Sequence, residues 1–141
     1  MQFFLSLIQI LPLIPVAFGW TLFHLNQANS CSSNMVSYAH YATLFFTFQI
    51  PFIVTRLFAG YQYRGVCGNV LDTFFQSLFY VYGILLLDEG NCVGSNLFNF
   101  TLLTVCVSGL LIVGNVLEGF RNRENYAVVY HSAKGGYVAI P

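Results

Sequence analysis

Acidic and basic side chains stand at the ends of apolar segments, where they could pair or exchange protons. Asp72 lies near the start of one segment, and Glu118 lies near the end of another, beside Arg121. Arg56 lies at the end of the segment before Asp72. Two carboxylates act as general acid and base only at a fixed separation, and the sequence sets none. We therefore expect ion pairs at the membrane rim, with Asp72 preferred over Glu118 as the partner of Arg56.

The histidines and cysteines do not form a recognisable cofactor site. His24 and His40 could approach each other, and two facing imidazoles in a helical bundle can hold a haem. No second pair and no supporting carboxylates accompany them, so we expect interfacial hydrogen bonding instead. The four cysteines include no C-x-x-C pair and no Cys/His cluster with zinc spacing. We expect no catalytic residue, cofactor or metal, although bound lipids fit an apolar chain.

Composition indicates what must position these residues. Of the 141 residues, 57% are hydrophobic and 7% are charged, whereas soluble domains carry about 25% charged residues. A membrane helix needs roughly 20 mostly apolar residues, and four segments fit: 3–23, 35–58, 70–87 and 97–120. The first lacks the basic start and cleavage pattern of a signal peptide. The sequence predicts an all-α integral membrane protein, with a four-transmembrane-helix bundle over 1–120 and a C-terminal tail over 121–141.

The basic residues indicate the orientation. All five lie either between the second and third segments or after the fourth: Arg56, Arg64, Arg121, Arg123 and Lys134. Excess arginine and lysine stays on the side from which a chain is inserted. Both termini are therefore expected on the cytoplasmic or matrix side.

The two loops on the opposite side, 25–34 and 88–96, contain no lysine or arginine and one cysteine each, Cys31 and Cys92. If that side is oxidising, a disulfide between them would join the two helical hairpins. Two free thiols are the alternative.

Four amide side chains are expected at a similar depth, about 7 to 14 Å inside the bilayer at about 1.5 Å of rise per residue. An amide facing lipid has no partner, so such groups turn inward and link helices. We expect an interhelical polar belt, with an ion or proton route as the alternative, formed by Gln9, Gln49, Gln76 and Asn115.

Prolines and aromatic residues mark two further features. Pro12 and Pro15 remove backbone hydrogen bonds, so the first span should be irregular. The second span carries an aromatic stripe that could dock other helices or a lipid: Tyr38, Tyr41, Phe45, Phe48 and Phe52. The tail from Glu124 is apolar, and we expect a partner protein or a second copy to order it.

These observations favour a non-catalytic accessory subunit of a larger membrane protein complex. A net charge of zero with a single lysine excludes a basic nucleic-acid-binding face. The short, lysine-poor chain favours the mitochondrial inner membrane, with the secretory pathway or plasma membrane as the alternative. A small homo-oligomeric channel or carrier is the second hypothesis. A membrane enzyme acting on a lipid near Arg56, Asp72 and Glu118 is the third.

Overall fold

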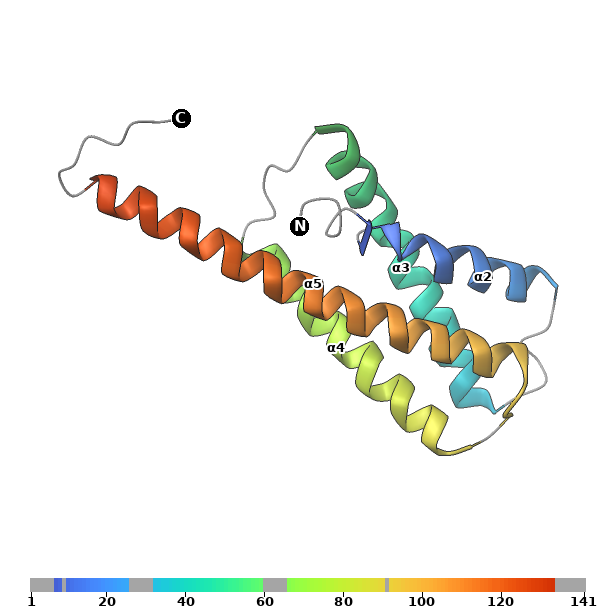
Figure 1. Ribbon diagram of the computed structural model, residues 1–141. Helices are drawn as coiled ribbons and strands as arrows, with labels where there is room; N and C mark the ends of the chain where they lie inside the picture. Colours follow the sequence, from blue (N-terminus) through green and yellow to red (C-terminus); the bar gives the residue numbers. More distant parts are fainter. Residues whose placement is uncertain (1–6, 9, 26–31, 60–65, 91, 134–141) are drawn as a thin grey trace.

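The computed structural model describes residues 7–8, 10–25, 32–59, 66–90 and 92–133, and side chains within 55–59, 66–69 and 121–133 lie outside that description. Its described residues form four helices and no strand (Figure 1). The helices are α2 (Leu13–His24), α3 (Ser33–Ala59), α4 (Val66–Asp88) and α5 (Asn96–Ala133). The predicted all-α class is confirmed.

Two of these helices are long and apolar enough to cross a membrane. They are α4 over Val70–Asp88 and α5 over Asn96–Phe120, whereas α2 is a shorter apolar helix of 12 residues. Membrane association is thus supported by two helices of the described part of the chain. The bundle of four spans and the orientation of its ends remain predictions.

Prolines interrupt the helical structure just before α2. Leu11 and Pro12 form a turn, and α2 begins only at Leu13. Pro15 has no N–H to donate, and the Leu11 carbonyl accepts from the N–H of Ile14 at 3.0 Å. The expected irregularity is confirmed. One continuous helix over 3–23 is not observed in the residues described.

Helices α4 and α5 form an antiparallel hairpin whose members lie side by side (Figure 1). Gly90 and Gly94 adopt left-handed φ angles of 63° and 84° in the turn, where glycine carries no steric penalty. The Ser95 hydroxyl accepts the N–H of Phe98 at 3.1 Å and so caps the start of α5. The hairpin is longer than predicted, because α4 starts at Val66 rather than 70 and α5 continues beyond 120 to Ala133.

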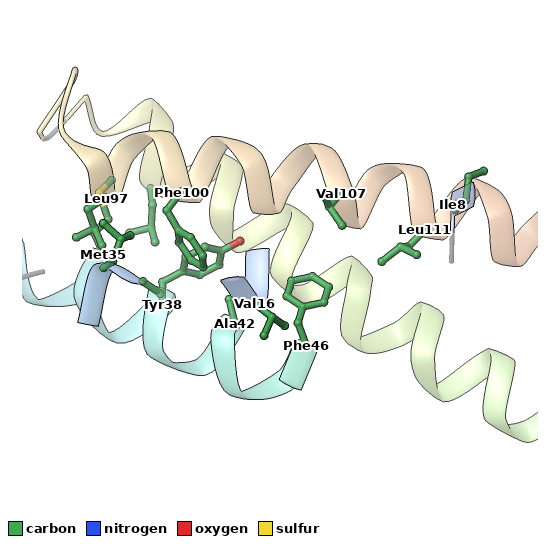
Figure 2. Close-up of a cluster of buried hydrophobic side chains, with 13 residues drawn as sticks. Ile8, Val16, Met35, Tyr38, Ala42, Phe46, Leu97, Phe100, Val107 and Leu111 are labelled. Carbon is green, nitrogen blue, oxygen red and sulfur yellow. The ribbon is translucent and has the colours of Figure 1, made fainter. Parts of the chain in front are cut away.

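The core is built around one face of α3. Its buried positions repeat at helical spacing and pack against α2 and α5, with Tyr38, Phe46 and Phe100 among the largest enclosed side chains (Figure 2). Phe100 of α5 also contacts Phe18 of α2, with ring centroids 5.8 Å apart. This packing holds α2, α3 and α5 at fixed positions relative to one another.

Candidate functional site

Asp72 joins three helices. The Gln49 side chain of α3 donates from Nε2 to Asp72 Oδ1 at 2.6 Å, and Asn115 of α5 donates from Nδ2 to Asp72 Oδ2 at 2.9 Å. Each carboxylate oxygen therefore accepts one amide N–H from a different helix. We call Gln49, Asp72 and Asn115 the Asp72 cluster.

Aromatic packing sets the register of α3 against α4 near this cluster. Phe45, one turn before Gln49, contacts Phe75 and Phe79 with ring centroids 5.7 and 4.9 Å apart. Farther along, the Tyr38 hydroxyl donates to the backbone carbonyl of Phe79 at 2.9 Å. These contacts align Gln49 with Asp72, which lies three residues before Phe75 on α4.

Gln76 lies one helical turn after Asp72, on the same side of α4. Its side chain is 0% exposed, and neither its Oε1 nor its Nε2 has a hydrogen-bond partner. A buried amide without partners costs about 1 to 3 kcal/mol on protein mutational scales. The hydrogen bonds that Asp72 accepts do not extend to Gln76, so the burial of the Gln76 amide has no compensating contact in the structure.

Helix α5 presents polar positions to the bundle interior. Thr101 and Thr104 are buried and donate to the carbonyls of Leu97 and Phe100, both at 2.9 Å. Ser108 is also buried, and its hydroxyl has no partner. With Asn115, these residues repeat at intervals of three, four and seven, which is one face of a helix. That spacing is a sequence signal for an inward polar face, in addition to the amide side chains that were predicted to face inward.

The amides of the predicted belt occupy different environments. Gln49 is 9% exposed, Gln76 is fully buried and Asn115 is half-buried. Gln49 and Asn115 meet through Asp72 rather than through each other, and Gln76 stands apart from these hydrogen bonds. Gln9 lies outside the described residues.

The predicted rim ion pairs depend partly on side chains that are not described. The side chains of Arg56 and Arg121 fall outside the description, so these pairs stay predictions. Glu118 is half-buried near the end of the candidate span of α5. Asp72 was predicted at a helix start but lies in the second turn of α4, inside the candidate span.

The two histidines have different surroundings. His40 stacks on Phe23 with ring centroids 3.9 Å apart, and its Nδ1 lies 3.2 Å from the carbonyl oxygen of Val36. His24 is exposed at the end of α2. Over the residues whose side chains are described, no group of three or more His, Cys, Asp or Glu could hold a metal ion.

Two of the cysteines lie in described surroundings. Cys92 is half-buried in the α4–α5 turn, and Cys106 of α5 is an exposed free thiol. Cys31 lies outside the described residues, so its disulfide with Cys92 stays a prediction.

No family model, curated protein or solved structure matches this chain. A carboxylate held by amides from two other helices can tie the bundle together.

Proposed function

We propose that this chain is a non-catalytic accessory subunit of a larger membrane protein complex. The length of α5 carries the proposal. Its 38 residues correspond to about 57 Å at about 1.5 Å per residue, against a hydrocarbon core of about 30 Å. The C-terminal part of α5 runs beyond the start of α4 (Figure 1).

This part, residues 121–133, is what we call the α5 arm. A short helix standing alone in water gains little stability, because most helical stability in proteins comes from packing. The arm follows directly on the candidate membrane span, which ends at Phe120. It is therefore suited to packing against an extramembrane surface of another subunit.

The outer face of α4 supports the same proposal. Only 17% of its span is buried inside the bundle, and large apolar side chains are exposed along it at helical spacing: Phe74, Leu78, Val81 and Leu85. On α3, Phe48 and Phe52 are also exposed, at 74% and 63%. Helices of a partner can pack on this surface, because the backbone N–H and C=O groups of each helix are already hydrogen-bonded within that helix.

The protein would form a four-span bundle with both ends on the cytoplasmic or matrix side, in the mitochondrial inner membrane or, alternatively, in a secretory-pathway or plasma membrane. A Cys31–Cys92 disulfide would close the opposite side. The distribution of basic residues supports the orientation.

The test is the size of the particle that contains the chain after mild detergent extraction from its native membrane. The full chain is expected to co-migrate with a larger assembly of other proteins. A truncation after Phe120, which removes the arm, should shift the chain to small particles. A truncation after Ala133 keeps the arm and is the matched control. A discrete oligomer of this chain alone would overturn the proposal and favour a channel or carrier.

A further inference from the structure

A groove with a volume of about 620 Å³ runs along one side of α2 and the residues just before it. Its described lining residues are apolar apart from one threonine: Leu7, Ile10, Leu11, Leu13, Ile14, Ala17, Phe18 and Thr21. We propose that this α2 groove binds one acyl chain of a membrane phospholipid. The inference goes beyond the proposed subunit role and does not depend on it. It requires only that the chain lies in a membrane, as α4 and α5 indicate.

Ala17 gives a reason for a depression at this place. Residues three and four positions apart are neighbours on a helix surface, so Ala17 lies between Leu13 and Ile14 on one side and Thr21 on the other. Its methyl group is shorter than the side chains around it. The sequence of α2 therefore leaves room that a longer side chain at position 17 would fill.

The bundle holds the inner wall of the groove in place. Leu11 and Phe18 pack against the hydrophobic core, and the Phe18 ring also contacts Phe100 of α5. Leu7 and Ile14, by contrast, are 50% and 49% exposed. The groove thus combines a fixed apolar wall with apolar side chains that face outward.

The chemistry of the lining favours hydrocarbon. The one hydroxyl among the described lining residues, that of Thr21, donates to the Ala17 carbonyl at 2.7 Å. Helix α2 contains no acidic residue, lysine or arginine, and its one titratable side chain is His24 at its end. A polar ligand would lose its hydration in the groove without gaining hydrogen bonds in return, whereas an acyl chain loses none.

Size favours a single acyl chain over a protein partner. Small-ligand sites have volumes of about 300 to 1,000 Å³, and the groove lies within that range. A stable protein interface involves about 20 to 30 residues on each side, whereas eight described residues line the groove. A flexible chain can follow such a surface, and it gains dispersion contacts there from more than one side.

The test uses Trp20, the one tryptophan of the chain, as a fluorescent reporter, because it lies one turn beyond Ala17 on α2. The full chain in detergent micelles is titrated with a phosphatidylcholine that carries bromine on an acyl chain and quenches tryptophan fluorescence on contact. Quenching is expected to saturate at a low mole fraction of this lipid, and the unbrominated lipid should reverse it. Ala17→Phe fills the groove and should raise the half-saturating lipid concentration by about tenfold or more.

Val81→Phe is the matched control. It also adds an aromatic ring at an exposed position, because Val81 is 55% exposed, but it lies on α4 outside the groove and should not change half-saturation. Ala17 is exposed, so the added ring stays outside the core, and circular dichroism shows which variants are folded. Thr21→Phe fills the groove from its other end and remains informative if Ala17→Phe does not fold.

Two results overturn the proposal. One is quenching that only follows the mole fraction of lipid in the micelle, or an unchanged half-saturation in the folded, groove-filling variants, because the contact is then with bulk lipid. The other is an elution volume that changes from that of a dimer to that of a monomer in Ala17→Phe, because the groove is then covered by a second copy of the chain.

Discussion

The Asp72 side chain connects three helices through hydrogen bonds in the interior of the bundle. Its two oxygens accept N–H groups from α3 and α5, and hydrogen bonds to charged groups contribute more than neutral ones. Asp72 therefore links elements that are far apart in sequence. Gln76, one turn away, lacks these contacts and provides an internal comparison.

The first prediction uses that comparison. Asn115→Leu should destabilise the bundle by about 1 to 3 kcal/mol, because it removes a donor from a partly buried carboxylate. Gln76→Leu should be neutral or stabilising, because it removes a buried amide that has no partner. The measurement is unfolding of each variant in mixed micelles. If both variants lost the same stability, the hydrogen bond from Asn115 to Asp72 would make no specific contribution to the stability of the bundle.

The second prediction concerns the cysteines. Peptide mapping without reduction should recover Cys31 joined to Cys92, while Cys106, which is free and exposed in the structure, should react with a maleimide after the chain is unfolded without reductant. The chemical reason is that each of the two lysine-free and arginine-free loops carries one of the bridging cysteines. Full maleimide labelling of Cys31 and Cys92 in protein isolated without reductant would refute the bridge.

How well residue environments could be predicted depended on helix boundaries. Counting residues from the predicted span ends was enough to assign Gln49 and Asn115 to a common depth. The same count placed Asp72 at a helix start, because no residue pattern signalled that α4 begins at Val66. The earlier start moves the carboxylate into the second turn, where it can accept from both amides. The sequence did not show which of these side chains hydrogen-bond to one another, because that depends on how the helices are aligned in three dimensions.

At the scale of helices, close approach between elements depends on two glycines. A Cβ atom at Gly19 of α2 would overlap the side chain of Thr43 on α3, and one at Gly83 of α4 would overlap Tyr38 and Val105. Small residues at such crossings let membrane helices pack closely. The sequence contains twelve glycines, and nothing in their local pattern distinguished these two.

The third prediction tests these approaches. Gly83→Ala should destabilise the bundle by about 1 to 3 kcal/mol, because the added methyl group overpacks the contact with α3 and α5. Gly119→Ala is the control, since no atom lies within 4 Å of its added Cβ, and it should stabilise the helix by about 0.5 to 1 kcal/mol. Thermal unfolding of both variants measures the difference. An unchanged midpoint for Gly83→Ala would mean that the two helices separate easily at this point.

The helices were predictable because the backbone groups of a long apolar segment must hydrogen-bond within the segment itself. The break before α2 was predictable because Pro12 and Pro15 have no N–H group. The continuation of α5 to Ala133 was not predicted. Residues 121–133 are polar and charged at first, and the change in composition looked like a helix end. Hydrogen bonding propagates through such a change once a helix has formed.

At the scale of the whole molecule, the chain combines a small bundle with surfaces that the bundle does not use. The α5 arm extends past α4 (Figure 1), and most of the α4 span lies on the outside. Lipid can cover the α4 face, whereas the arm lies outside the candidate span and is proposed to pack against a partner protein. The account therefore predicts that another protein contacts both surfaces.

Site-specific photo-cross-linking in the native membrane tests this claim most directly. A photoreactive amino acid replacing Leu78, on the exposed α4 face, or Tyr126, in the α5 arm, should give adducts with a different protein, identified by mass spectrometry. The same group replacing Leu86, which is 2% exposed, is the internal control and should give only adducts within the chain. Adducts at Leu78 and Tyr126 restricted to lipid, or to second copies of this chain, would contradict the accessory-subunit account.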